Sequence, residues 1–305
     1  MSTPNIDAGA KLQFQESFYK LAQQRNTKLG SSSAVFYLPA DGKTNNMARI
    51  GSTELVEVNL RNPDKQYIDY DLDNRKMTKR RFTRTFQVDK LYDINNLLAD
   101  PTSPLMENLL NAANRVTDRV IVSASVGDVL VGGPEETGTL VSAANDGVIT
   151  VAATSGLTYA TIQSITQNFI NNDLEYEDFM GTVLAISGKE NTALMGQTNF
   201  ISNDFITSRP VEEGVMRNVG TYGIVMFAGS VDGGITKVNP ILPEASGVRK
   251  CVALAPRSIA MSKKVDLLEV KESATKVNSW DVTIDLWINA MRIEGKRVQI
   301  FTTTI

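Results

Sequence analysis

The sequence predicts an α+β fold, on three observations. Residues 103–123 carry apolar side chains at helical spacing over about twenty positions, longer than an average helix. Residues 80–88 and 281–289 alternate apolar and polar side chains, which is typical of strands with one wet face. Residues 179–187 form a near-continuous apolar run, which is typical of a central strand.

The chain opens with an arm. Residues 8–25 place Leu12, Phe14, Phe18 and Leu21 at helical spacing, and the run Ser31–Ser33 then breaks the pattern. A short amphipathic helix ahead of a serine hinge has too few neighbours to form a domain, so we expect an N-terminal arm over residues 1–42.

Residues 43–93 form a strongly charged segment, with 19 charged residues among 51. Residues 55–60, 67–73 and 80–88 nevertheless alternate with period two, which predicts strands. A core does not accept this charge density. We therefore expect an extended β-hairpin loop whose apolar face another molecule covers.

The long helix follows. Ser103 suits the N-cap and Pro104 the first helical position, and the pattern runs to Ser123. Short strands are then expected at 126–131, 137–142 and 148–152, separated by glycine turns.

The remaining chain predicts a helix-and-sheet region. A second helix begins at Thr158, with Ile162, Ile165, Phe169 and Ile170 toward the core. Further elements are the strand 179–187, a short helix at 191–198, and strands at 223–228, 251–255, 281–289 and 297–301.

Composition narrows the function classes. The chain has no histidine, which removes the commonest general base and metal ligand. Its one cysteine, Cys251, lies in an apolar run and is interpreted as a buried structural thiol. A net charge of −3 argues against an electrostatic nucleic-acid binder, and no apolar run is long enough to span a bilayer. We expect a soluble protein of a reducing compartment without a signal peptide.

No active site emerges from the motifs. Asp69, Asp71 and Asp73 have the spacing of a calcium loop, but Asn74 and Arg80 replace its glycine and glutamate, so the carboxylates are better placed on the wet face of a strand. The glycine pairs lack phosphate-loop spacing. We expect no catalytic residue, no metal and no cofactor.

The charged segment instead has the pattern of a contact surface. It is acidic up to residue 73 and basic from residue 75, a dipolar arrangement suited to a neighbouring subunit or to pairing across a hairpin. A merely solvated face and a nucleic-acid patch remain alternatives. The expected intersubunit contacts are Asp69, Asp71, Asp73, Arg75, Lys76, Lys79, Arg80, Arg81 and Arg84.

The order of elements resembles the major capsid proteins of tailed bacteriophages, with the Hong Kong 97 fold. The resemblance covers nearly the whole chain and is carried by the long helix at 103–123, the helix opening at Gly156-Leu157-Thr158, the strands at 179–187 and 220–227, and the run 251–260.

This resemblance implies a shell subunit with defined parts. They are the N-terminal arm at 1–42, an extended loop at 43–93, a peripheral domain at 94–155 with the spine helix, an axial domain at 156–262, and a peripheral return at 263–305. The implied partners are other copies in hexamers and pentamers, a separate scaffolding protein, a portal, a decoration protein and non-specifically packaged double-stranded DNA. The implied location is the virion, after assembly in the bacterial cytoplasm.

Two rival functions stay open at this point. One is an encapsulin-type compartment, which has the same fold around cargo enzymes. The other is a soluble enzyme that uses carboxylates such as Glu175 and Asp178.

Overall fold

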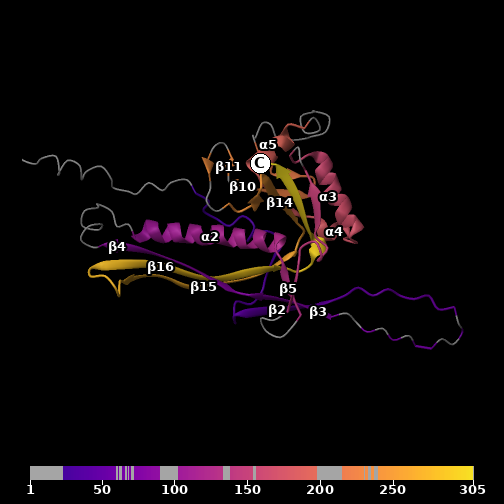
Figure 1. Cartoon of the computed structure of the whole chain (residues 1–305), viewed down its shortest axis with the longest axis horizontal. Coiled ribbons are helices and arrows are strands. Elements are labelled where there is room, and N and C mark those ends of the chain that lie inside the picture. The colour runs from indigo at the N-terminus through magenta and orange to yellow at the C-terminus, as the bar shows by residue number, and fades with distance from the viewer. Residues whose placement is uncertain are drawn as a thin grey trace, which may run out of the picture.

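The computed structural model describes residues 23–59, 61, 64–65, 67, 69, 72–89, 102–132, 138–153, 156–197, 215–229, 231–232, 235–236 and 240–304. In Figure 1 a long helix lies along an elongated sheet, a compact helix-and-sheet region stands at one end, and a loop extends away from the body. The predicted mixture of helices and strands is confirmed. The helix expected at 8–25 falls almost entirely outside the described residues.

The compact region is built on a seven-stranded mixed sheet, in the order β7-β17-β14-β8-β10-β9, with β13 pairing β14. All five residues of β8 are buried, as expected for a central strand. The strands are β7 (Ile149–Ala152), β8 (Val183–Ser187), β9 (Asn218–Val219), β10 (Tyr222–Phe227), β13 (Glu244–Ala245), β14 (Val248–Leu254) and β17 (Val298–Thr304).

Three helices accompany this sheet: α3 (Tyr159–Asn171), α4 (Tyr176–Phe179) and α5 (Gly188–Met195). The helix predicted to begin at Thr158 is α3, and Thr158 is its N-cap, since its side chain accepts from the backbone N–H of Thr161. The expectation that Ile170 faces the core is wrong, because its side chain is 57% exposed.

The elongated sheet has the order β1-β15-β16-β4 and one face against α2 (Thr102–Val126). The long hairpin of β15 (Ile259–Glu272) and β16 (Ser279–Arg292) forms its centre, with β1 (Val35–Tyr37) and β4 (Arg80–Asp89) at its edges. Helix α2 begins at Thr102, so Ser103 lies inside its first turn rather than at the N-cap.

A smaller sheet has the order β2-β3-β5-β6 and lies at the root of the extended loop. It comprises β2 (Thr44–Ile50), β3 (Leu72–Thr78), β5 (Val129–Val131) and β6 (Thr139–Val141). The described elements also include the β11 (Val231–Asp232) and β12 (Ile235–Thr236) pair and a 3-10 turn, η3 (Gly295–Arg297).

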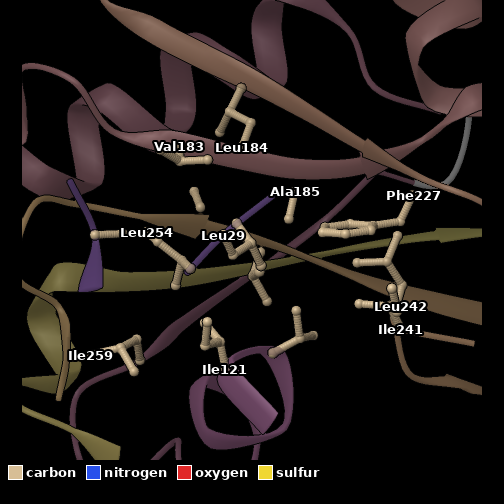
Figure 2. Close-up of a cluster of buried hydrophobic side chains, with 14 of the residues drawn as sticks. Leu29, Ile121, Val183, Leu184, Ala185, Phe227, Ile241, Leu242, Leu254 and Ile259 are labelled. Atoms are coloured by element: carbon tan, nitrogen blue, oxygen red, sulfur yellow. The ribbon is translucent and has the colours of Figure 1, made fainter. Parts of the chain in front are cut away.

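One apolar core joins the helix-and-sheet region to the long helix. Leu29, Ile121, Leu184 and Leu254 are all fully buried members of one hydrophobic cluster, and they come from four different parts of the chain (Figure 2). A contiguous core of this kind holds the elongated part and the compact part together.

The domain boundaries expected from the sequence do not follow the sheets. They assign β7 and β17 to the peripheral domain, whereas both strands pair within the seven-stranded sheet, β17 with β14 and with β7. Strand β4 also departs from expectation, because it pairs with β16 along its whole length instead of belonging to a projecting hairpin.

Candidate intersubunit interface

The extended loop between β2 and β3 is exposed throughout residues 51–59. Residues 55–59 form no strand, so the strand predicted at 55–60 is wrong over these positions. Of the strand predicted at 67–73, residues 72 and 73 belong to β3, residues 67 and 69 are not in a strand, and the other positions lie outside the described residues. Period-two patterning alone does not make a strand, because the backbone hydrogen bonds must come from a partner strand.

This loop exposes apolar side chains that a folded monomer ordinarily covers. Leu55 is 100% exposed and Tyr67 88% exposed, and Val56 and Val58 are exposed as well. At the root, Ile50 and Leu72 stand opposite each other in the β2–β3 register, and both are exposed. Several large apolar side chains exposed along one loop indicate a site of protein–protein contact.

A chain of buried charges fixes the loop root to the body. Arg49 pairs with Asp73, and Arg75 Nη1 donates to Asp146 Oδ2 at 2.8 Å. Arg292 Nε donates to the same Asp146 oxygen at 3.0 Å. The side chains of Arg75, Asp146 and Arg292 are 1%, 6% and 0% exposed.

Arg292 also closes the carboxyl end of α2. Its Nη1 donates to the carbonyl of Ala124 at 3.0 Å and to that of Gly127. These carbonyls lack partners within the helix, and a cation at this end is favoured by the helix dipole. Burial lowers the pKa of Arg292, and hydrogen bonding and charge from Asp146 oppose that shift. The two guanidiniums and Asp146 thus join β3, β16 and α2.

Of the predicted contact residues, Arg75, Lys76 and Lys79 lie inside the subunit. Lys76 is 6% exposed and Lys79 is 4% exposed. The Lys79 ammonium donates to the carbonyls of Ala40 and Gly42, and burial lowers its pKa. Arg75 and Lys79 bond to residues in distant segments of the chain, which sequence reasoning did not identify.

Arg80, Arg81 and Arg84 are exposed on β4. Arg81 Nε donates to both carboxylate oxygens of Asp285 at 2.9 Å, and its guanidinium stands 5.9 Å from the ring centroid of Trp287. The hydrogen bond with Asp285 raises the pKa of Arg81. Arg81 is engaged with β16, and Arg80 Nη2 also donates to Asn289 Oδ1 of β16, at 3.5 Å. Arg84 is exposed on the same strand and available to a neighbouring molecule.

The three aspartates among the predicted contact residues also differ in their exposure. Asp69 is exposed on the loop, Asp73 is half-buried beside Arg49, and Asp71 lies outside the described residues. No group of three acidic or cysteine ligands able to hold a metal ion occurs among the described residues.

A groove of about 1060 Å³ lies between the loop root and the α3–α4 connection. Asp178, one of the two carboxylates considered for an enzyme, lines it and accepts from Arg297 Nη2 at 2.9 Å, whereas Glu175 is exposed as the N-cap residue of α4. Asp178 thus forms a partly exposed ion pair with Arg297.

Cys251 is fully buried in β14. Burial in the core raises the pKa of its thiol, and the nearby Glu190 adds to the shift. A thiol held in its neutral form is a poor nucleophile, so the interpretation as a structural cysteine is confirmed. No helix in the described part of the chain is long and apolar enough to cross a membrane.

Comparison with known proteins identifies the family of this chain. The profile of a family described as phage capsid protein matches residues 6–303. Among curated proteins no match was found.

Solved structures of phage capsids have the same fold. The acid-stable capsid of Helicobacter pylori bacteriophage KHP30 is 10% identical, covers 100% of this chain and 99% of its own, and has a TM-score of 0.67. The cyanophage Pam1 capsid is 12% identical, with coverages of 96% and 95% and a TM-score of 0.66. The mature capsid of bacteriophage PhiM1 is 11% identical, with coverages of 96% and 92% and a TM-score of 0.65. The family match spans nearly the whole sequence, and the exposed loop gives the subunit a surface for neighbours. The chain belongs to the phage capsid proteins and is a shell protein of a phage head.

Proposed function

We propose that this chain is the subunit of a self-assembling icosahedral head with the Hong Kong 97 architecture, which encloses the double-stranded DNA of a tailed phage. The observation that carries the proposal is the apolar loop between β2 and β3, with Leu55 fully exposed. No described part of the subunit covers this side chain, whereas a neighbour in a closed shell would.

The expected strength of a contact made by this loop fits a shell. Burying one Leu or Val side chain stabilises a contact by ~1.5–3 kcal/mol before association costs are subtracted. Three such side chains give a modest contact between two subunits. Symmetric repetition over a closed particle makes a modest contact sufficient, and it leaves assembly reversible while errors are corrected.

The parts are assigned by this proposal as follows. The loop at 51–71 lies on a neighbour, and α2 with the β1-β15-β16-β4 sheet forms the peripheral domain. The seven-stranded sheet with its three helices forms the axial domain, now including β7 and β17, around the hexamer and pentamer centres.

The proposed charged contacts are the exposed members of the predicted set. Asp69 on the loop and Arg80 and Arg84 on β4 face solvent in the isolated subunit. Opposite charges across an interface fix its register and speed the encounter of subunits. Asp71 stays in this set as a prediction from the sequence.

The proposal also includes three partners: a separate scaffolding protein, a portal and a decoration protein. Assembly takes place in the bacterial cytoplasm, and the subunit itself has no enzymatic activity. The net charge of −3 supports non-specific rather than tight contact with the packaged DNA.

Negative-stain electron microscopy of the purified chain, alone and with its scaffolding protein, tests this function. We expect capsomers, sheets or closed particles. A compact monomer at every concentration, with and without scaffold, contradicts the proposal.

A further inference from the structure

The segment just before β1 is bound by one face of the long helix. Residues 23–29 contain no helix or strand, yet their polar groups are held by Asn114, Arg115 and Asp118 of α2. Positions 114, 115 and 118 lie three and four residues apart, so they face the same side of the helix. Asn114 Nδ2 donates to the carbonyl of Arg25 at 2.8 Å, and Arg115 Nη1 donates to Gln23 Oε1 at 2.8 Å.

Asp118 makes the densest set of these contacts. Its carboxylate is fully buried and accepts from the side chains of Gln24 and Thr27 and from two backbone N–H groups. The N–H groups of Lys28 and Leu29 donate to it, each at 3.0 Å. A buried charge is tolerated only when it is hydrogen-bonded in this way, and such bonds are stronger than neutral ones.

The residues that follow hold the segment in one register. Leu29 is fully buried in the core beside Ile121 (Figure 2). Ser33 Oγ then donates to the Gly181 carbonyl at 2.9 Å, and β1 pairs in parallel with β15. Because Leu29 is buried in the core, the residues just before it are held next to Asp118, where their polar groups donate to its carboxylate.

We propose that Asp118 is the positioning residue of the amino-terminal segment. It fixes residues 23–29 on α2, and thereby the place from which the chain on their amino-terminal side can reach a second copy. The part of this inference that concerns a second copy rests on the proposed shell function. The contact with residues 23–29 stands without it.

Hydrogen exchange read by mass spectrometry tests the contact in the full-length subunit. In Asp118→Asn the negative charge is lost and an NH2 donor replaces one carboxylate oxygen, so the donors of residues 24–29 that face that oxygen lose their acceptor. We expect exchange in the peptide that covers residues 23–30 to rise at least about tenfold, while peptides from β17 and β8 are unchanged. Thr27→Val removes one donor without altering Asp118, and it should raise exchange in the same peptide by a smaller factor. Asp266→Asn is the matched control, since it removes an exposed carboxylate far from the segment, 50% exposed beside Lys264.

Unchanged exchange at residues 23–30 in both Asp118→Asn and Thr27→Val overturns the inference. Equal increases in all peptides also overturn it, because they show a general loss of stability rather than release of the segment. Electron microscopy of the same variants separates this inference from the function. If the unaltered chain forms particles and Asp118→Asn forms malformed or open assemblies, the result supports both the shell function and the positioning role of Asp118. Normal particles from Asp118→Asn overturn the positioning role, and absence of particles from the unaltered chain counts against the shell function alone.

Discussion

Removing the Asp146 carboxylate should destabilise the subunit more than removing almost any surface charge. In Asp146→Ala, the guanidiniums of Arg75 and Arg292 keep their burial, at 1% and 0% exposed, and lose the anion between them. Breaking a buried ion pair by removing one partner typically costs about 3–5 kcal/mol. Arg292 keeps its bonds to the α2 carbonyls, which places the expected loss near the lower end of that range.

Urea unfolding of the unassembled subunit, followed by circular dichroism, measures this loss. Asp266→Ala is the matched control, because its carboxylate pairs with Lys264 at 3.6 Å in a half-exposed position. Exposed pairs contribute roughly 0–1 kcal/mol. A loss for Asp146→Ala no larger than that of the control refutes the view that Asp146 joins the loop root to the long helix.

Three other predictions follow from described contacts. Arg81→Glu should lower the melting temperature more than Arg84→Glu, because it sets a second carboxylate against the buried Asp285, and equal shifts in a thermal scan contradict this. The pKa of Glu190 is lowered, since its bonds to Ser187 and Thr303 and the charge of Arg249 outweigh the effect of burial. Its contribution to stability is therefore complete above its ordinary pKa of 4.5 and is lost as the pH falls below it. Unfolding measured between pH 7 and pH 3 should show a steeper acid loss for the unaltered chain than for Glu190→Gln, and parallel curves contradict this. Cys251 should react with a thiol reagent at pH 8 only as the protein unfolds, so rapid reaction of the folded subunit contradicts its burial.

The sequence predicts the elements that carry their own periodicity. The long helix, the buried strand β8, the alternating strand β16 and the start of α3 are all found close to their expected positions. Each is encoded by side chains within about twenty residues, so local spacing is sufficient to identify it. The fold class follows from their order.

The contacts that organise the interface lie beyond local spacing. Arg75 meets Asp146 across 71 residues and the Arg292 carbonyl across 217, and no pattern in the chain links these positions. The sequence therefore predicts a charged segment without distinguishing the interior cations, such as Arg75 and Lys79, from the exposed Arg84. The strand predicted at 55–60 fails over residues 55–59 for a related reason, because its alternation anticipates a partner strand that is not found in the described part of the chain.

The central claim is that a neighbouring subunit covers the apolar loop. The most direct measurement compares particle formation by Leu55→Ser/Val58→Ser with that of Ile170→Gln, which removes an apolar side chain that is 57% exposed on α3. Sedimentation velocity and negative-stain microscopy read the result. We predict that the loop variant stays folded with an unchanged melting temperature but forms no closed particles, while Ile170→Gln assembles like the unaltered chain. Closed particles from the loop variant, in normal yield, contradict the claim.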